Sequence, residues 1–135
     1  MERIIRIVCI LILYFCGVCS FANPPAQTPQ STPLGIPQNV TQPQCVKTFN
    51  VGFEKLFLLT EAAISHNNFN IEEIQSQGGY IVFSYYQYKF LATVFTFGNN
   101  KAILKISPCN NNYNFPPLIV RNIFNYININ QYKKF

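Results

Sequence analysis

The segment Gly78–Phe97, GGYIVFSYYQYKFLATVFTF, decides the fold of this chain. Its paired glycines favour a turn. Two runs rich in aromatic and β-branched residues then follow, YIVFSYY at Tyr80–Tyr86 and FLATVFTF at Phe90–Phe97. Such side chains fit the pleated, half-buried surface of a sheet. The segment therefore predicts two consecutive β-strands.

Two more strands are predicted on either side of this segment. Phe69–Gln75 forms a short candidate before the glycine turn. After a tight connection at Gly98-Asn99-Asn100, Ala102–Ser107 alternates apolar and polar residues, and Pro108 ends it. The chain therefore contains a run of four predicted strands.

An amphipathic helix is predicted before these strands and another after them. Apolar residues recur at helical spacing over Gly52–His66 and again over Pro117–Ile129. Prolines at the start of the second helix suit a first helical turn. The two inward stripes are Phe53, Leu56, Phe57, Thr60, Ala63 and Ile64, and Val120, Ile123, Phe124 and Ile127.

The order of elements, α-β-β-β-β-α, predicts an α+β fold. A two-layer structure, with a four-stranded antiparallel sheet and two helices on one face, is the simplest way to bury these stripes. The order provides no β-α-β crossover, so a parallel nucleotide-binding sheet is not expected. The arrangement is similar to that of small envelope domains that pack helices on one side of a short sheet, but no motif assigns a family.

The N-terminal segment, residues 1–22, has the pattern of a secretory signal peptide. A basic MERIIR start precedes the uncharged apolar run Ile7–Val18, and Ser20-Phe21-Ala22 provides a small-residue cleavage site. We expect cleavage after Ala22 and a secreted or periplasmic product. The alternative is a retained N-terminal anchor, although the apolar run has 12 residues and a membrane-spanning helix needs ~20.

The cysteines are interpreted from this export signal. The C-x-x-C at Cys16 and Cys19 lies at the end of the predicted signal peptide, where a redox centre is not expected. Cleavage leaves Cys45 and Cys109, and two thiols in an exported chain favour one disulfide. The alternative is a pair of unpaired, buried thiols.

Residues 23–44 are predicted to be a disordered linker, and residues 45–135 to be the small α+β domain. The linker holds six prolines and five glutamines, with no charged and no aromatic residue. Such a composition buries too little apolar surface to offset the entropy lost on ordering. It therefore favours an extended tether between the export signal and the domain.

Residues suited to catalysis are sparse. The chain has no aspartate, and His66 is its only histidine. Glu72 and Glu73 are the only adjacent carboxylates, and in a regular strand their side chains point to opposite faces. No P-loop and no zinc-binding spacing is present. We therefore expect no enzyme activity, no cofactor and no metal; the alternative is a small hydrolase or transferase that uses His66.

Charge and aromatic residues suggest a binding surface. From Ile74 onward there are six cationic side chains and no carboxylate. Tyrosine offers flat contact area beside such charge, which suits an anionic lipid or polymer. The candidate surface comprises Tyr80, Tyr85, Tyr86, Tyr88, Lys89, Lys101 and Lys105. The alternative is that these residues only form strands and keep the domain soluble.

These patterns together predict an exported, non-catalytic binding or structural domain. Its partner is expected to be an envelope component, another protein or a second copy of the chain. Nucleic acid is not expected, because GGYIVFSYY departs from the RNA-recognition strand pattern and an exported protein rarely meets RNA.

Overall fold

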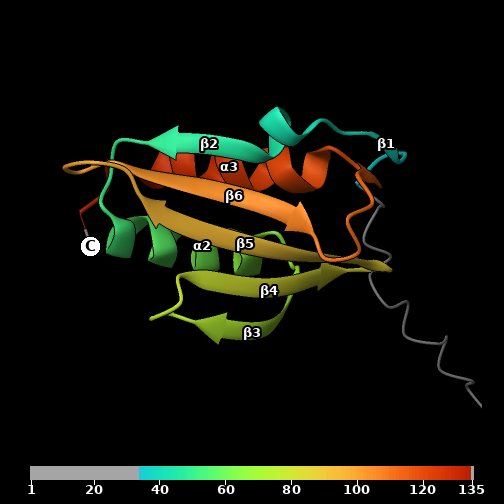
Figure 1. The fold of residues 1–135 in the computed structure, drawn as a ribbon, viewed down its shortest axis with the longest axis horizontal. Coiled ribbons are helices and arrows are strands. Elements are labelled where there is room, and N and C mark those ends of the chain that lie inside the picture. The colour runs from blue at the N-terminus through green and yellow to red at the C-terminus, as the bar shows by residue number, and fades with distance from the viewer. Residues whose placement is uncertain (1–33, 135) are drawn as a thin grey trace, which may run out of the picture. The chain divides into compact units, whose positions relative to one another are not determined.

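The structure is a computed structural model that describes residues 34–134. Its main sheet has five antiparallel strands in the order β2-β6-β5-β4-β3 (Figure 1). These strands are β2 (Val46–Phe49), β3 (Asn70–Gln75), β4 (Tyr80–Tyr85), β5 (Tyr88–Thr96) and β6 (Ala102–Pro108). The α+β class with two helices and an antiparallel sheet is confirmed.

The prediction of four strands was wrong by one strand. β2 pairs with β6 along its whole length, from Val46 opposite Lys105 to Phe49 opposite Ala102. It was missed because it has only four residues, VKTF, which are too few to show a clear alternation of apolar and polar side chains. Its position at the free edge of β6 is set by long-range pairing.

Both helices lie on the same face of this sheet (Figure 1). They are α2 (Phe53–His66) and α3 (Leu118–Asn130), and each contributes a buried apolar stripe to a single core that also takes alternate residues of the strands. In the helical stripes, every residue except Phe53 is buried. Across residues 34–134, neither helix is long and apolar enough to cross a membrane.

The second half of the predicted linker belongs to the folded domain. β1 (Gln38–Asn39) pairs antiparallel with β7 (Asn114–Phe115), and a short 3-10 helix, η1 (Gln42–Cys45), follows. The side chain of Val40 is buried, and its N–H donates to the carbonyl of Tyr113 at 2.8 Å. The sequence did not predict this, because the average composition of 22 residues does not show that Val40 becomes buried or that Gln38 and Asn39 pair with β7. These features depend on contacts with a segment far along the chain. Residues 23–33 lie outside the described part of the chain.

Candidate functional site

The face of the sheet opposite the helices carries apolar side chains. In β5, Phe90, Ala92 and Val94 are buried against the helices, so Leu91 and Phe95 point to the other side. We call this surface the open face. Its apolar members are Val46, Val82, Leu91, Phe95 and Ile103, of which Phe95 is 48% and Val46 40% exposed.

Strand register places these side chains beside one another. Leu91 lies opposite Val82 of β4, and Phe95 lies opposite Ile103 of β6. Lys105 stands opposite both Thr93 and Val46. Directly opposed residues have Cβ atoms about 5 Å apart. The open face is therefore a set of short apolar rows with one cation between them.

Glu72 and Glu73 share the open face, contrary to the sequence-based expectation. The register of β3 against β4 shifts between Ile71 and Glu73, which is a β-bulge at Glu72. A bulge inserts one extra residue, so the strict alternation of side chains is lost there. Glu72 then reaches Lys89, and Glu73 reaches Tyr80, both on the open face.

The two carboxylates make different contacts. Glu72 Oε2 lies 2.5 Å from Lys89 Nζ, and the hydrogen bonds from Lys89 and then Ser84 lower the pKa of Glu72. The same contact raises the pKa of Lys89. Tyr80 donates its hydroxyl hydrogen to Glu73 Oε1 at 3.0 Å, which raises the pKa of Tyr80. The acidic edge of the face is therefore already held in place by its neighbours.

The predicted tyrosine–lysine surface is divided by the fold. Tyr80, Lys89 and Lys105 lie on the open face. Tyr85 and Tyr88 pack against the core on the other side. The two remaining residues, Tyr86 and Lys101, lie in the turns that follow β4 and β5. Sequence spacing could not separate these groups because the strand ends and the facing of each strand were unknown.

A second concave surface lies at the β4–β5 hairpin. A pocket of about 240 Å³ is lined by tyrosines and by the incoming chain: Leu34, Gly35, Pro37, Tyr85, Tyr86, Gln87, Tyr88 and Pro116. The N–H of Leu34 donates to the hydroxyl oxygen of Tyr85 at 3.1 Å. The chain's own entry segment therefore already occupies part of this surface.

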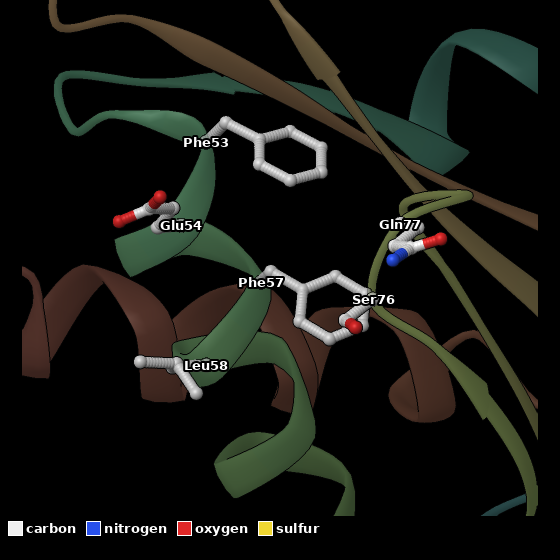
Figure 2. A pocket seen from close by; sticks show the side chains of 6 residues that line it. All are labelled: Phe53, Glu54, Phe57, Leu58, Ser76 and Gln77. Atoms are coloured by element: carbon white, nitrogen blue, oxygen red, sulfur yellow. The ribbon is translucent and has the colours of Figure 1, made fainter.

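Another pocket lies between the start of α2 and the β3–β4 turn. It encloses about 410 Å³ and is lined by Phe53, Glu54, Phe57, Leu58, Ser76 and Gln77. Figure 2 shows both phenylalanine rings directed from α2 toward the turn, while Glu54 and Leu58 point the other way. The two rings stack with centroids 6.2 Å apart. The two rings form an apolar wall on the side of α2, and Ser76 and Gln77 supply polar groups on the side of the turn.

The structure does not bring Cys45 and Cys109 together. Both are free thiols; Cys45 is buried and Cys109 is exposed. Cys109 directly follows β6, and its side chain lies near Lys89 on the open face of the sheet. Cys45 packs in the core on the side of the helices. A disulfide needs Cα atoms within about 7 Å and Cβ atoms that face each other. Side chains on opposite faces of a sheet do not meet this condition, so the predicted bond is not formed in this structure.

His66 is the last residue of α2, as the sequence predicted. Its ring packs against the ring of Tyr126. Their ring centroids are 4.8 Å apart. The shallow pocket around them, about 220 Å³, is otherwise lined by Asn67, Asn122, Asn125 and Ile129. None of these lining residues is a carboxylate, a serine or a cysteine.

Comparison with known proteins does not assign a family. No family model matches the chain, and no curated protein sequence matches it. Within residues 34–134, no three His, Cys, Asp or Glu side chains are grouped so that they could hold a metal ion.

The residues that sequence reasoning missed are the five apolar members of the open face. A signal was present, because Leu91, Thr93 and Phe95 alternate with Phe90, Ala92 and Val94. Both sets are largely apolar, so the alternation does not reveal which face the helices cover.

Proposed function

We propose that the protein is an exported, non-catalytic protein-binding module that uses the open face of its sheet. The observation that carries the proposal is the exposure of apolar side chains from four neighbouring strands on a face that no helix of residues 34–134 covers. The proposal of export depends on the signal-peptide pattern of residues 1–22, which lie outside the described residues.

The energetics of this surface favour association. Removing apolar surface from water contributes roughly 25 cal/mol per Å². Large apolar patches that remain exposed on a folded domain are typical of interaction sites. Here the polar residues around the patch, Lys89, Glu72 and Glu73, are held by hydrogen bonds or an ion pair. A partner would therefore meet apolar rows with an ordered polar rim.

The surroundings of His66 support the non-catalytic part of the proposal. A general base needs a nucleophile or a polarised water within hydrogen-bond reach. The imidazole of His66 instead packs against the ring of Tyr126, and the rest of the pocket is lined by three asparagines and Ile129. The carboxylates Glu72 and Glu73 lie on the opposite layer of the fold, because they belong to the open face.

The alternative of a basic surface for anionic lipid or polymer has less support. Lys89 is paired with Glu72, and Lys101 lies in a turn, so Lys105 is the unpaired cation of the predicted set on the open face. Electrostatic attraction to an anionic surface grows with the number of uncompensated charges. Glu73, on the same face, reduces it further.

Site-specific photo-crosslinking tests the proposal. A benzophenone amino acid is placed at Phe95 on the open face, and in a control chain at Ile129, which is 71% exposed on α3. Irradiation of the exported fraction should give one discrete protein adduct from position 95 and none from position 129. The adduct should disappear when Leu91→Lys is added. Equal adducts from both positions, or none from position 95, would contradict the use of this face.

The catalytic alternative is tested separately. The purified protein and its His66→Ala variant are compared in a broad screen of hydrolase and transferase substrates. We expect no turnover from either protein and an unchanged adduct from position 95 in the variant. Turnover that is lost in His66→Ala would overturn the non-catalytic assignment.

A further inference from the structure

We propose that the partner of the open face is the open face of a second copy of this chain. The inference rests on the proposed function, because it names the occupant of the same surface. Its basis is that the charges and the apolar rows of the face complement themselves under a two-fold rotation.

The rotation is defined by the strand order. Consider a two-fold axis that runs parallel to the strands, in the plane of the interface, between β4 and β5. It places β5 over β4 of the second copy and β6 over β3, and it preserves the position along the strands. Two sheets can pack in this way about 10 Å apart, with their strand directions about 30° from alignment.

The apolar centre of the face then pairs with itself. Leu91 and Val82 are direct neighbours across β5 and β4, so the rotation places each of them over the other residue in the second copy. Four aliphatic side chains meet at the axis. Both residues are partly exposed in the single chain, and a second copy would remove them from water.

The same rotation also brings opposite charges of the face together. Lys105 on β6 is exposed and makes no ion pair within residues 34–134. In register it belongs to the row of Thr93, Tyr80 and Gln75, and Glu73 lies one row further along β3. The rotation that places β6 over β3 therefore brings Lys105 over the region of Glu73 in the second copy. The contact occurs twice, once on each side of the axis.

This complementarity selects a second copy among the possible occupants. An interface with two-fold symmetry must place residue i of one copy against residue j of the other, and residue j against residue i. At both symmetry-related positions the rotation matches a cation, Lys105, with the region of a carboxylate, Glu73, and an apolar side chain, Leu91, with another, Val82. The contact also closes on itself, so it produces a dimer and no filament.

Charge reversal and its rescue test the proposal. Sedimentation equilibrium of the purified protein should show a concentration-dependent dimer. Lys105→Glu and Glu73→Lys should each raise the dissociation constant by at least about tenfold, because each places like charges in contact. The double variant restores the pairs in reversed order and should return the constant to within about threefold. Lys134→Glu, with the same change of charge beyond the end of α3, should have no effect.

Each outcome of this experiment decides the proposal. Folding of every variant is checked by its urea midpoint, and Leu91→Lys provides an independent disruption that leaves the charges of the pair in place. A protein that stays monomeric up to about 1 mM, a constant in the range of the weakest interactions, would overturn the dimer. So would a double variant as weak as the single ones. If the crosslink from position 95 then joins a different protein, the proposed function still holds. If that crosslink is also absent, both fail.

Discussion

Gly79 lies where the β3–β4 turn touches α2, and its φ of +68° is in the left-handed region. A Cβ at this position would lie 2.9 Å from Cε2 of Phe53 and 3.0 Å from the backbone oxygen of Val94. The N–H of Val94 also donates to the carbonyl of Gly79 at 2.8 Å, so the turn cannot move away easily. Glycine at this position therefore allows the turn to approach the ring of Phe53, which lines the 410 Å³ pocket.

Gly79→Ala should lower the free energy of unfolding by about 3 kcal/mol. The left-handed backbone accounts for about 1 to 2 kcal/mol and the close contact for the rest. Gly98→Ala is the matched control, because Gly98 has a φ of +74° but no atom within 4 Å of the added Cβ. It should lose only about 1 kcal/mol. Urea unfolding measures both, and equal losses would contradict the close approach of Phe53.

Cys45 is a thiol in the core whose pKa is raised by burial. It is 1% exposed, and burial raises the pKa of its thiol from 9.0 to about 11. The charged thiolate is unfavourable in the core because it loses its hydration there. In the folded protein the thiol therefore keeps its proton at a pH at which the unfolded chain has released it.

Stability should consequently fall as the pH rises from about 9 to about 11. In this window the unfolded state binds fewer protons than the folded state, so the free energy of unfolding decreases by about 1.4 kcal/mol per pH unit at most. Urea unfolding of the protein and of Cys45→Ser, which cannot titrate here, should diverge by about 2 to 3 kcal/mol over the window. Parallel curves would contradict a buried free thiol and would agree with the disulfide expected from the sequence.

At the scale of elements, the N-terminus of α2 lacks a side chain that caps the helix. Its N-cap is Gly52, which has extended backbone angles and makes no side-chain capping hydrogen bond. A Cβ added to Gly52 would meet no atom within 4 Å. A serine at this position has space for its side chain and supplies an oxygen that can accept a hydrogen bond from a backbone N–H of the first turn.

Gly52→Ser should therefore raise the free energy of unfolding by a few tenths of a kcal/mol. The comparison with Gly52→Ala separates the capping oxygen from the effect of any added Cβ, because alanine has no acceptor. Thermal unfolding of the three proteins in one buffer measures the differences. A serine variant no more stable than the alanine variant would show that the hydroxyl does not cap α2.

The elements also differ in how far they could be predicted. Both helices were predicted within one residue of their ends, because their apolar spacing is local and regular. The bulge in β3 was not predicted, and it reverses the expected separation of Glu72 and Glu73. A bulge is set by how β3 fits against β4, and the amino acids IEEI do not encode that fit by themselves.

At the scale of the whole molecule, export and the thiols can be tested in one measurement. If the signal peptide is cleaved after Ala22, the intact mass of the released product should correspond to a chain that begins at Asn23. Alkylation before unfolding should modify Cys109, which is exposed, and should leave Cys45 unmodified. A product that retains Cys16 and Cys19 would contradict cleavage, and a mass two hydrogens lower with no alkylation would favour the disulfide.

The sequence by itself determined the α+β class, both amphipathic helices and the strands around Gly78–Phe97, because each has a periodic pattern within a few turns of chain. It also indicated an export signal and a scarcity of catalytic groups. Only the tertiary structure decided the fifth strand, the folding of residues 34–44, the separation of Cys45 from Cys109 and the makeup of the open face. These features depend on which strand edges pair and which face the helices cover, and both are contacts between residues far apart in the chain.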